Sequence, residues 1–249
     1  MRTILSERSR PILEKFASAK VLLAFDFDGT LSPIVTDPDR AAIRGSTRRV
    51  LRKLAQLYPC IVVSGRGRSD VLRRVRGIGF KEVVGNHGIE SSDSSRDIAQ
   101  TVRGWILLLR PKLKGMHGIA IEDKTFSISV HYRKARRKKR AVQAITEAAR
   151  NLPGVRVIGG KQVINIVLRG APHKGHAVLR EQRKRHCDRA MFVGDDETDE
   201  NAFALSRNGR LLGIRVGLRR SSLADFYIRD QREIDRLLRV LIELRTRAE

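Results

Sequence analysis

The order of apolar and polar residues over the first 90 positions predicts short buried strands that alternate with helices. The apolar runs end in polar residues and glycine, and apolar residues recur at helical spacing between them. Ser46-Thr47 and Ser69 are expected to cap the second and third helices, and Gly77 to end the third. Alternation of this kind predicts a parallel, doubly wound sheet. Strands are predicted at 21–26, 60–66 and 81–90, and helices at 6–19, 46–57 and 69–77.

A different pattern begins after about residue 91. The polar linker 91–97 precedes an order of helix, hairpin, helix, hairpin, with a turn at Asp123-Lys124 and with Gly159-Gly160 joining the last two strands. This order predicts an inserted α+β unit with an antiparallel sheet, because the first pattern then resumes. The insert has helices at 97–110 and 134–151 and strands within 117–133 and 155–169; helices at 173–185 and 231–246 and strands at 189–200 and 210–217 follow.

Two carboxylates end the strand at 21–26. Side chains alternate along a strand, so Asp26 and Asp28 face the same way. Carboxylates this close raise each other's pKa unless a cation lies between them. Ligands of parallel sheets bind beyond the carboxyl ends of the strands, where Ser64, Asn86 and His87 are also expected. The sequence therefore predicts a metal, a shared proton, or both at this edge.

Four separated motifs share this predicted edge, and each taken singly has a structural explanation such as a turn, a helix cap or a surface lysine. The motifs are Asp26-x-Asp28-Gly29-Thr30, Ser64-Gly65-Arg66, Lys174-Gly175 and Gly194-Asp195-Asp196-x-Thr198-Asp199. Their order and spacing together resemble the haloacid dehalogenase superfamily of phosphohydrolases. The resemblance implies an α/β fold, with a Rossmann-like, doubly wound parallel-sheet core and an inserted α+β cap domain.

The resemblance also implies a domain organisation. Residues 1–92 and 170–249 would form the hydrolase core, and 93–169 the cap that selects the substrate. Hinges are expected near 91–95 and 169–173, where Gly170 and Pro172 interrupt regular structure.

Each motif has an implied role in phosphate-ester hydrolysis. Asp26 would attack phosphorus and form an aspartyl-phosphate, which divides one difficult step into two. Asp28 would protonate the leaving alkoxide and later activate water. Ser64 would donate a hydrogen bond to a phosphoryl oxygen, and Lys174 would neutralise the nucleophile and the phosphate.

Mg²⁺ is the expected cofactor, because it prefers oxygen ligands and retains water. The resemblance implies that Asp26, the carbonyl of Asp28 and Asp195 bind it, with Asp196 and Asp199 as further ligands or as supports of the ligands. Gly29 and Gly194 would allow the backbone to approach the phosphate and the metal.

Further motifs are Ser32-Pro33-Ile34, Asp37-Pro38, Gly85-Asn86-His87-Gly88-x-Glu90, Glu122-Asp123-Lys124 and Val130-His131-Tyr132-Arg133. Together with Ser64-Gly65-Arg66 they resemble the trehalose-6-phosphate phosphatase family. The resemblance implies hydrolysis of trehalose 6-phosphate to trehalose and phosphate in trehalose biosynthesis, alongside a trehalose-phosphate synthase. Hydroxyls of the sugar would be bound by Glu122 and Lys124, with Arg66, His87 and Arg133 lining the cleft, although an exposed turn pair and structural roles are the alternatives.

One segment departs from that family. A Glu-x-Arg-Pro sequence is usual before the lysine motif, and its glutamate contacts the sugar. Here the segment reads Asn165-Ile166-Val167-Leu168-Arg169, so that Asn165 is the nearest polar candidate and the charge is lost. A phosphatase acting on another sugar phosphate or phosphorylated glycoside is therefore kept as an alternative.

Composition adds a strong positive charge. The formal net charge is +24, and 133–140 reads RKARRKKR. A basic scaffold that binds nucleic acid is a third hypothesis, but aromatic residues make up only 5% of the chain and nucleic acid is not expected as a partner. The charge has a simpler use in attracting a dianionic substrate.

The location predicted from the sequence is cytoplasmic. Cys60 and Cys187 lie far apart without a metal-binding pattern, which favours a reducing compartment. A signal peptide and an apolar run long enough to cross a bilayer are both missing, so no contact with a membrane is expected.

Overall fold

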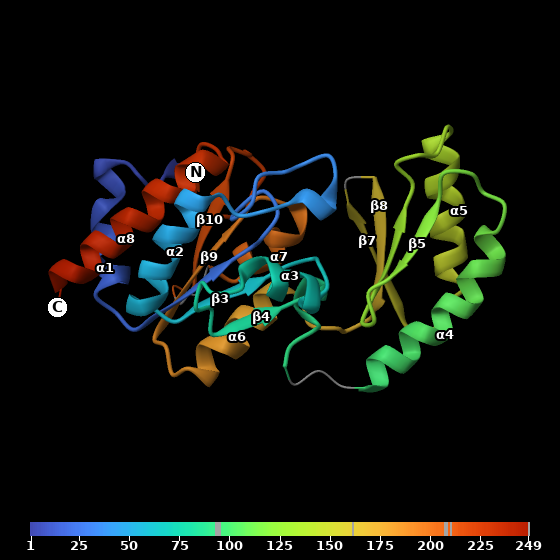
Figure 1. Cartoon of the computed structure of the whole chain (residues 1–249), viewed down its shortest axis with the longest axis horizontal. Coiled ribbons are helices and arrows are strands. Elements are labelled where there is room, and N and C mark those ends of the chain that lie inside the picture. The colour runs from blue at the N-terminus through green and yellow to red at the C-terminus, as the bar shows by residue number, and fades with distance from the viewer. Residues whose placement is uncertain (93–95, 161, 207–208, 210, 249) are drawn as a thin grey trace. The chain divides into compact units, whose positions relative to one another are not determined.

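The computed structural model in Figure 1 describes residues 1–92, 96–160, 162–206, 209 and 211–248. Two compact units make up the chain: a core unit of Met1–Ser92 with Pro172–Glu249, and an insert unit of Asp93–Ala171. Residues 93–95 of the predicted first hinge lie outside the described residues, as do Lys161 and Arg210 of the predicted strands.

The core unit is built on a seven-stranded sheet in which every pair of neighbours is parallel. The strand order is β1-β11-β10-β9-β2-β3-β4. The chain therefore adds β3 and β4 on one side of β2 and then returns on its other side with β9. The predicted α/β fold class is confirmed. The strands are β1 Arg2–Thr3, β2 Val21–Phe25, β3 Cys60–Val63, β4 Glu82–Val84, β9 Arg189–Gly194, β10 Leu211–Val216 and β11 Phe226–Ile228.

Both faces of this sheet are covered, as a parallel sheet requires. Leu23 and Phe25 of β2 pack in one apolar cluster with residues of α1, α2, α3 and α8. Leu22 and Ala24 pack in a second cluster on the other face, with residues of α6 and α7. The helices are α1 Arg10–Ala17, α2 Gly45–Leu57, α3 Arg68–Val75, α6 Lys174–Lys184, α7 Glu200–Phe203 and α8 Ile234–Ala248, with short 3-10 segments at Glu7–Ser9, Pro38–Arg40, Asn86–Gly88, Glu197–Asp199 and Gln231–Glu233.

Some local predictions for the core unit were wrong. Helix α3 begins at Arg68 with Gly67 at its N-cap position, so Ser69 lies inside it. Helix α2 begins at Gly45 after Arg44, with no side-chain cap. The short strands β1 and β11 were missed, because two or three residues are too few to show the period of a strand.

The insert unit has a four-stranded antiparallel sheet of order β5-β6-β8-β7, and two helices pack on one face of it (Figure 1). The predicted hairpin turn is present, because Lys124 N donates to the Ser127 carbonyl. Gly159 and Gly160 lie within β7 and do not join the strands, which corrects the prediction. The elements are α4 Arg96–Leu113, β5 Ala120–Asp123, β6 Ile128–His131, α5 Lys138–Arg150, β7 Val155–Gly160 and β8 Val163–Leu168.

The core of the insert unit lies between its sheet and the two helices. Trp105 of α4 is buried there, and its indole N–H donates to the Pro153 carbonyl at 3.1 Å. Helix α5 begins only at Lys138, so most of the basic run at 133–140 precedes it. Over the part of the chain that is described, none of the helices has both the length and the apolar character needed to span a bilayer.

Two leucines of α4 test this packing. Leu109 is fully buried, whereas Leu107 is 71% exposed. Leu109→Ala should lower the free energy of unfolding of the insert unit by about 2–5 kcal/mol, because it leaves a cavity. Leu107→Ala, the same change two residues earlier, should alter it by less than about 0.5 kcal/mol. Urea unfolding followed by the fluorescence of Trp105, the only tryptophan, measures both; equal effects would contradict the packing described.

Candidate active site

The carboxyl ends of three neighbouring strands of the core unit bring the first motifs together. Strand β2 lies between β9 and β3, and Asp26 N extends the pairing by donating to the Val193 carbonyl at 2.8 Å. Phe25 pairs with Val62, so Ser64 follows one residue beyond the level of Asp26. Asp26 is only 4% exposed. A buried strand thus delivers a carboxylate where the sheet ends, next to the polar ends of its neighbours.

A buried ammonium group joins two of the acidic side chains. Lys174, the first residue of α6, donates to Asp26 Oδ1 at 2.6 Å and to Asp199 Oδ1 at 2.7 Å. Burial opposes the charge of Lys174, but Asp199 and Asp26 outweigh it and raise the pKa of the lysine above its ordinary value. Lys174 is therefore a cation at neutral pH and fixes both carboxylates.

Three carboxylates converge at this point. Oxygen atoms of Asp26, Asp195 and Asp199 lie within 4.8 Å of one another. Burial raises the pKa of Asp26 well above its usual range, although Lys174 opposes this, and burial followed by repulsion from Asp199 raises the pKa of Asp195 to about 7. When all three carboxylates are ionised, their negative charge exceeds the positive charge of the one ammonium group by two. The group therefore fits a divalent cation that takes oxygen ligands.

Asp28 is held by an arginine. Arg66 donates from Nε to Asp28 Oδ2 at 2.6 Å and from Nη2 to Asp28 Oδ1 at 2.8 Å, a bidentate arrangement. The same guanidinium donates to Asp70 at 2.9 Å and to the Pro38 carbonyl at 2.9 Å, and it lies over the ring of Phe27. The Asp28 carboxylate therefore lies outside the acidic triad, which is formed by Asp26, Asp195 and Asp199. Arg66, which the resemblance assigned to the sugar cleft, binds Asp28, Asp70 and the Pro38 carbonyl instead.

The acidic loop after β9 divides its carboxylates between two places. Asp199 is buried and accepts from Asp196 N at 2.9 Å as well as from Lys174. Asp196 is exposed and its carboxylate accepts from Glu197 N at 2.7 Å, so it caps the short helix that begins there. The structure thus brings Asp195 and Asp199 to Asp26, and it leaves the Asp196 side chain at the helix start.

Backbone glycines make room for this convergence. Gly29 has φ +82°, and a Cβ atom there would lie 2.2 Å from Asp195 Oδ2. A Cβ atom on Gly194 would lie 2.4 Å from Asp199 Cγ. Both distances are impossible, so any side chain at either position would displace a carboxylate of the triad.

The loops after β3 and β4 are fixed to each other. Ser64 is fully buried, its Oγ accepts from Arg66 N at 3.2 Å, and its carbonyl accepts from His87 N at 2.9 Å. His87 has φ 58°, and its ring lies where a Cβ atom on Gly65 would be. Glu90 supports this loop by accepting from Asn86 Nδ2 at 2.7 Å.

The remaining predicted residues belong to the insert unit, where strand pairing aligns two of them. Glu122 pairs with Ser129 and Ser129 with Asn165, so the three form one row across the sheet. Asn165 is buried and its Oδ1 accepts from Ser129 Oγ at 2.6 Å. Glu122 contacts His131 at 2.7 Å and Lys124 at 4.0 Å, and Arg133 is exposed just after β6.

Comparison with known proteins gives a family for this arrangement. The family model for trehalose-phosphatase matches residues 24–222. The chain belongs to the trehalose-phosphatase family. Probable trehalose-phosphate phosphatase 4 of Oryza sativa subsp. japonica is 30% identical over 252 residues, which cover 93% of this chain and 68% of the rice protein. Trehalose-phosphate phosphatase of Mycolicibacterium paratuberculosis is 34% identical over 216 residues, 81% of this chain and 55% of its own length.

A solved structure shares the fold. The trehalose-6-phosphate phosphatase related protein has a TM-score of 0.75 and 24% sequence identity, over 92% of this chain and all of that one. The predicted membership of the trehalose-phosphatase family is thus confirmed by sequence, and its fold by structure.

Sequence motifs of the trehalose-phosphatase family did not reveal every residue of the site. Asp70 accepts from Arg66, Arg73 and Arg74. Arg215 of β10 donates to the Asp196 carbonyl at 3.2 Å, to the Asp195 carbonyl and to Glu200 at 2.9 Å. Neither carries a signal in the sequence, because a single Asp on a helix or Arg in a strand resembles an ordinary surface residue.

Asp70 provides a test of this arginine network by pH. Burial opposes its ionisation, but Arg74 and Arg66 hold its pKa below the ordinary value. A lowered pKa in the folded state stabilises the fold above the unfolded pKa of about 3.9, and this contribution is lost as the pH falls through the folded value. Asp70→Asn should therefore cost about 1 kcal/mol at pH 7 and much less at pH 3 by urea unfolding.

Arg73→Ala is the control for this measurement. It removes a partner of Asp70 whose side chain is 73% exposed, so its effect should be below about 0.5 kcal/mol at both pH values. An equal cost of Asp70→Asn at both pH values would show that the ion pairs do not stabilise the fold.

Proposed function

We propose that this chain hydrolyses trehalose 6-phosphate to trehalose and phosphate, with Mg²⁺ and an aspartyl-phosphate on Asp26. The observation that carries the proposal is the buried Asp26 carboxylate at the end of β2, 2.6 Å from Lys174 and within the acidic triad. Membership of the trehalose-phosphatase family supports the substrate. The core unit would perform the chemistry, and the predicted cap at 93–169, which lies within the insert unit, would select the sugar.

In the first step, an Asp26 oxygen bonds to phosphorus as the bond from phosphorus to the sugar oxygen breaks. Lys174 opposes the effect of burial on Asp26 and would stabilise charge on the phosphoryl oxygens, and Ser64 would donate a further hydrogen bond to them. Mg²⁺, held by Asp26, Asp195 and the Asp28 carbonyl with Asp199 and Asp196 in support, would neutralise negative charge there.

Asp28 would carry the proton in both steps. It gives a proton to the leaving alkoxide and later takes one from the water that attacks phosphorus, which releases phosphate and frees Asp26. Both oxygens of Asp28 accept hydrogen bonds from Arg66 in this structure. Arg66 would therefore be a positioning residue that must release one oxygen before Asp28 transfers a proton.

Selection of the sugar would depend on the insert unit and on His87. Glu122, Lys124 and Arg133 offer charged groups, and a hydroxyl-rich sugar is discriminated by polar groups that a wrong substrate leaves unpaired. Asn165 favours a second candidate, another sugar phosphate or phosphorylated glycoside, because it is neutral where a glutamate was expected and already accepts from Ser129.

We also propose a setting for the reaction. A trehalose-phosphate synthase would supply the substrate. A cytoplasmic location is supported by both cysteines, Cys60 and Cys187, being free thiols.

A phosphate-release assay tests the substrate and the nucleophile. With Mg²⁺, the protein should hydrolyse trehalose 6-phosphate far faster than glucose 6-phosphate, because only the disaccharide fills a site built for it. Asp26→Asn should lower kcat by about a thousandfold or more, whereas Asp188→Asn, at an exposed carboxylate, should leave it unchanged. Equal rates on both esters would remove the trehalose assignment, and full activity of Asp26→Asn would remove the mechanism.

Metal removal tests the acidic triad by two readouts. Chelator-treated protein should lose activity and regain it with Mg²⁺. The thermal unfolding midpoint should rise with Mg²⁺, because an ion bound only by the folded state stabilises it. Asp195→Asn should reduce this rise, and Asp123→Asn, outside the triad, should retain it. A midpoint insensitive to Mg²⁺ in the parent protein would contradict a metal site at these carboxylates.

A further inference from the structure

The insert unit contains a cavity that the proposed reaction does not use. It is a pocket open to solvent with a volume of about 490 Å³, and all its lining residues belong to the insert unit. The catalytic carboxylates all belong to the core unit. The lining residues are Tyr132, Lys138, Lys139, Val142, Gln143 and Gln162.

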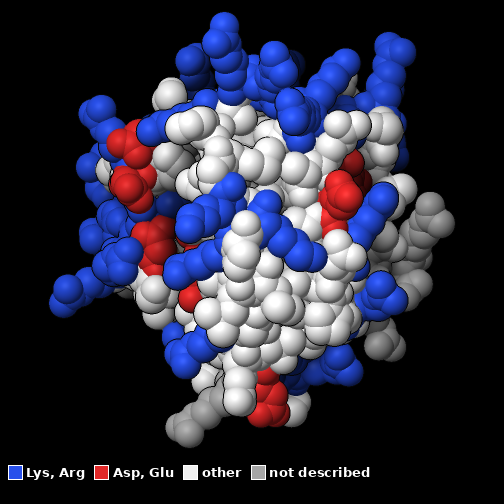
Figure 2. All heavy atoms as spheres, turned by 90° about the vertical axis from the view of Figure 1, so that its right-hand side faces the viewer, with Lys and Arg blue, Asp and Glu red and all other residues white. Residues whose placement is uncertain are grey.

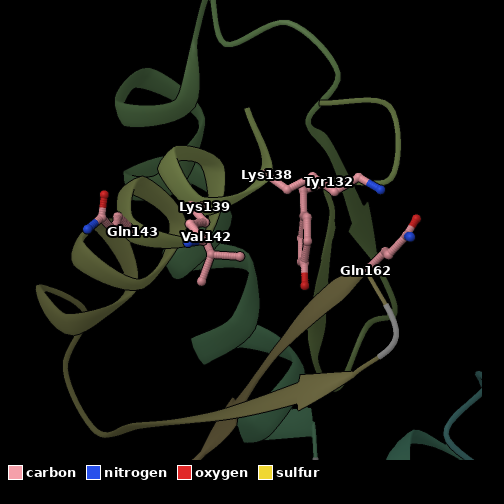
Figure 3. Close-up of a pocket in the computed structure, with 6 residues that line it drawn as sticks. All are labelled: Tyr132, Lys138, Lys139, Val142, Gln143 and Gln162. Carbon is pink, nitrogen blue, oxygen red and sulfur yellow. The ribbon is translucent and has the colours of Figure 1, made fainter. Parts of the chain in front are cut away.

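The side chains of this cavity have a definite arrangement (Figure 3). Tyr132, just after β6, stands between Val142 of α5 on one side and Gln162 of the turn after β7 on the other. Lys138 and Lys139 come from the first turn of α5. The cavity therefore combines an aromatic ring and an aliphatic wall with two lysines and two amides.

The two lysines have no carboxylate partner among the residues that the structure describes, and both are exposed. The lining of the cavity contains no Asp or Glu. The run 133–140 adds further Lys and Arg, and Figure 2 shows Lys and Arg crowded along the upper edge of the face that it displays. Positive charge that the protein leaves uncompensated in a cavity favours an anionic ligand.

Gln162 adds an observation of a different kind. Its φ of 63° lies in the left-handed region, which is costly for a residue with a long side chain. Its carbonyl accepts from Tyr132 N at 3.1 Å, so the strained turn and the ring are fixed to each other. A positive φ is usual in a two-residue turn between paired strands, so the turn between β7 and β8 holds Tyr132 in place beside it.

The chemistry of the lining selects among anions. Inorganic phosphate needs no ring or aliphatic wall, and a sugar needs a lining richer in polar surface than this largely apolar one. A planar, weakly polar body that carries phosphate fits better, because the ring can stack on Tyr132 while the lysines contact the phosphates. We propose that this cavity binds a nucleoside phosphate.

Fluorescence anisotropy of ADP labelled on its ribose with an N-methylanthraniloyl group tests the proposal, in chelator so that no metal contributes. Unlabelled ADP should displace the probe, and adenosine and pyrophosphate should do so at least about tenfold less well, because each lacks one half of the ligand. Trehalose 6-phosphate should compete poorly. A probe that fails to bind, or displacement by pyrophosphate or trehalose 6-phosphate as effective as that by ADP, would overturn the proposal.

Paired variants locate the binding. Lys138→Ala/Lys139→Ala should weaken ADP binding by about tenfold or more, whereas Lys134→Ala/Arg136→Ala, which removes the same charge outside the lining, should weaken it far less. Tyr132→Leu keeps an apolar side chain but loses the ring, so it should weaken binding of ADP and not of pyrophosphate. Equal weakening by both double variants would show that ADP binds to the general positive charge of this surface and not to the cavity, which would overturn the proposal. Thermal unfolding of each variant verifies its fold.

Discussion

The contact of Lys174 with Asp26 and Asp199 is the interaction on which the site depends. Without this cation, three carboxylates, two of them buried, would face one another with nothing to offset their repulsion, and each would favour its protonated form. The ammonium opposes the rise in pKa that burial causes at Asp26. Because it offsets only part of the negative charge, the group still fits a divalent cation.

The order of the strands explains why residues so far apart in sequence meet there. After β2 the chain moves outward through β3 and β4, and it returns on the opposite side of β2 with β9. The helices that leave β2 and β9 must diverge at this point, so the strand ends remain open to a ligand. Asp26 and Asp195 follow these two strands, and Lys174 begins the helix that precedes β9. The insert unit is placed in the chain between the two halves of this arrangement.

The sequence was most informative where a residue type and its spacing reflect one physical need. Asp26 and Asp195 could be predicted because each follows a buried strand of the fold. Gly29 and Gly194 could be predicted because a side chain at either position would occupy the space of a carboxylate. The bidentate contact of Arg66 with Asp28 did not follow, because the direction of a long side chain depends on Asp70 and Pro38, which the fold alone brings near. Helix starts failed for a related reason: α2 and α3 begin without a side-chain cap.

Positive side chains have different surroundings in the core unit and in the insert unit. In the core unit the positive side chains near the site are used: Lys174, Arg66 and Arg215 each contact carboxylates or carbonyls at fixed positions. In the insert unit Lys138 and Lys139 contact no such groups in the described chain. Lys138 and Lys139 are exposed, so water solvates them and their charge remains available to an anionic ligand. The positive charge of the chain therefore has two settings: part of it binds acidic side chains of the core unit, and part of it lies beside the cavity of the insert unit.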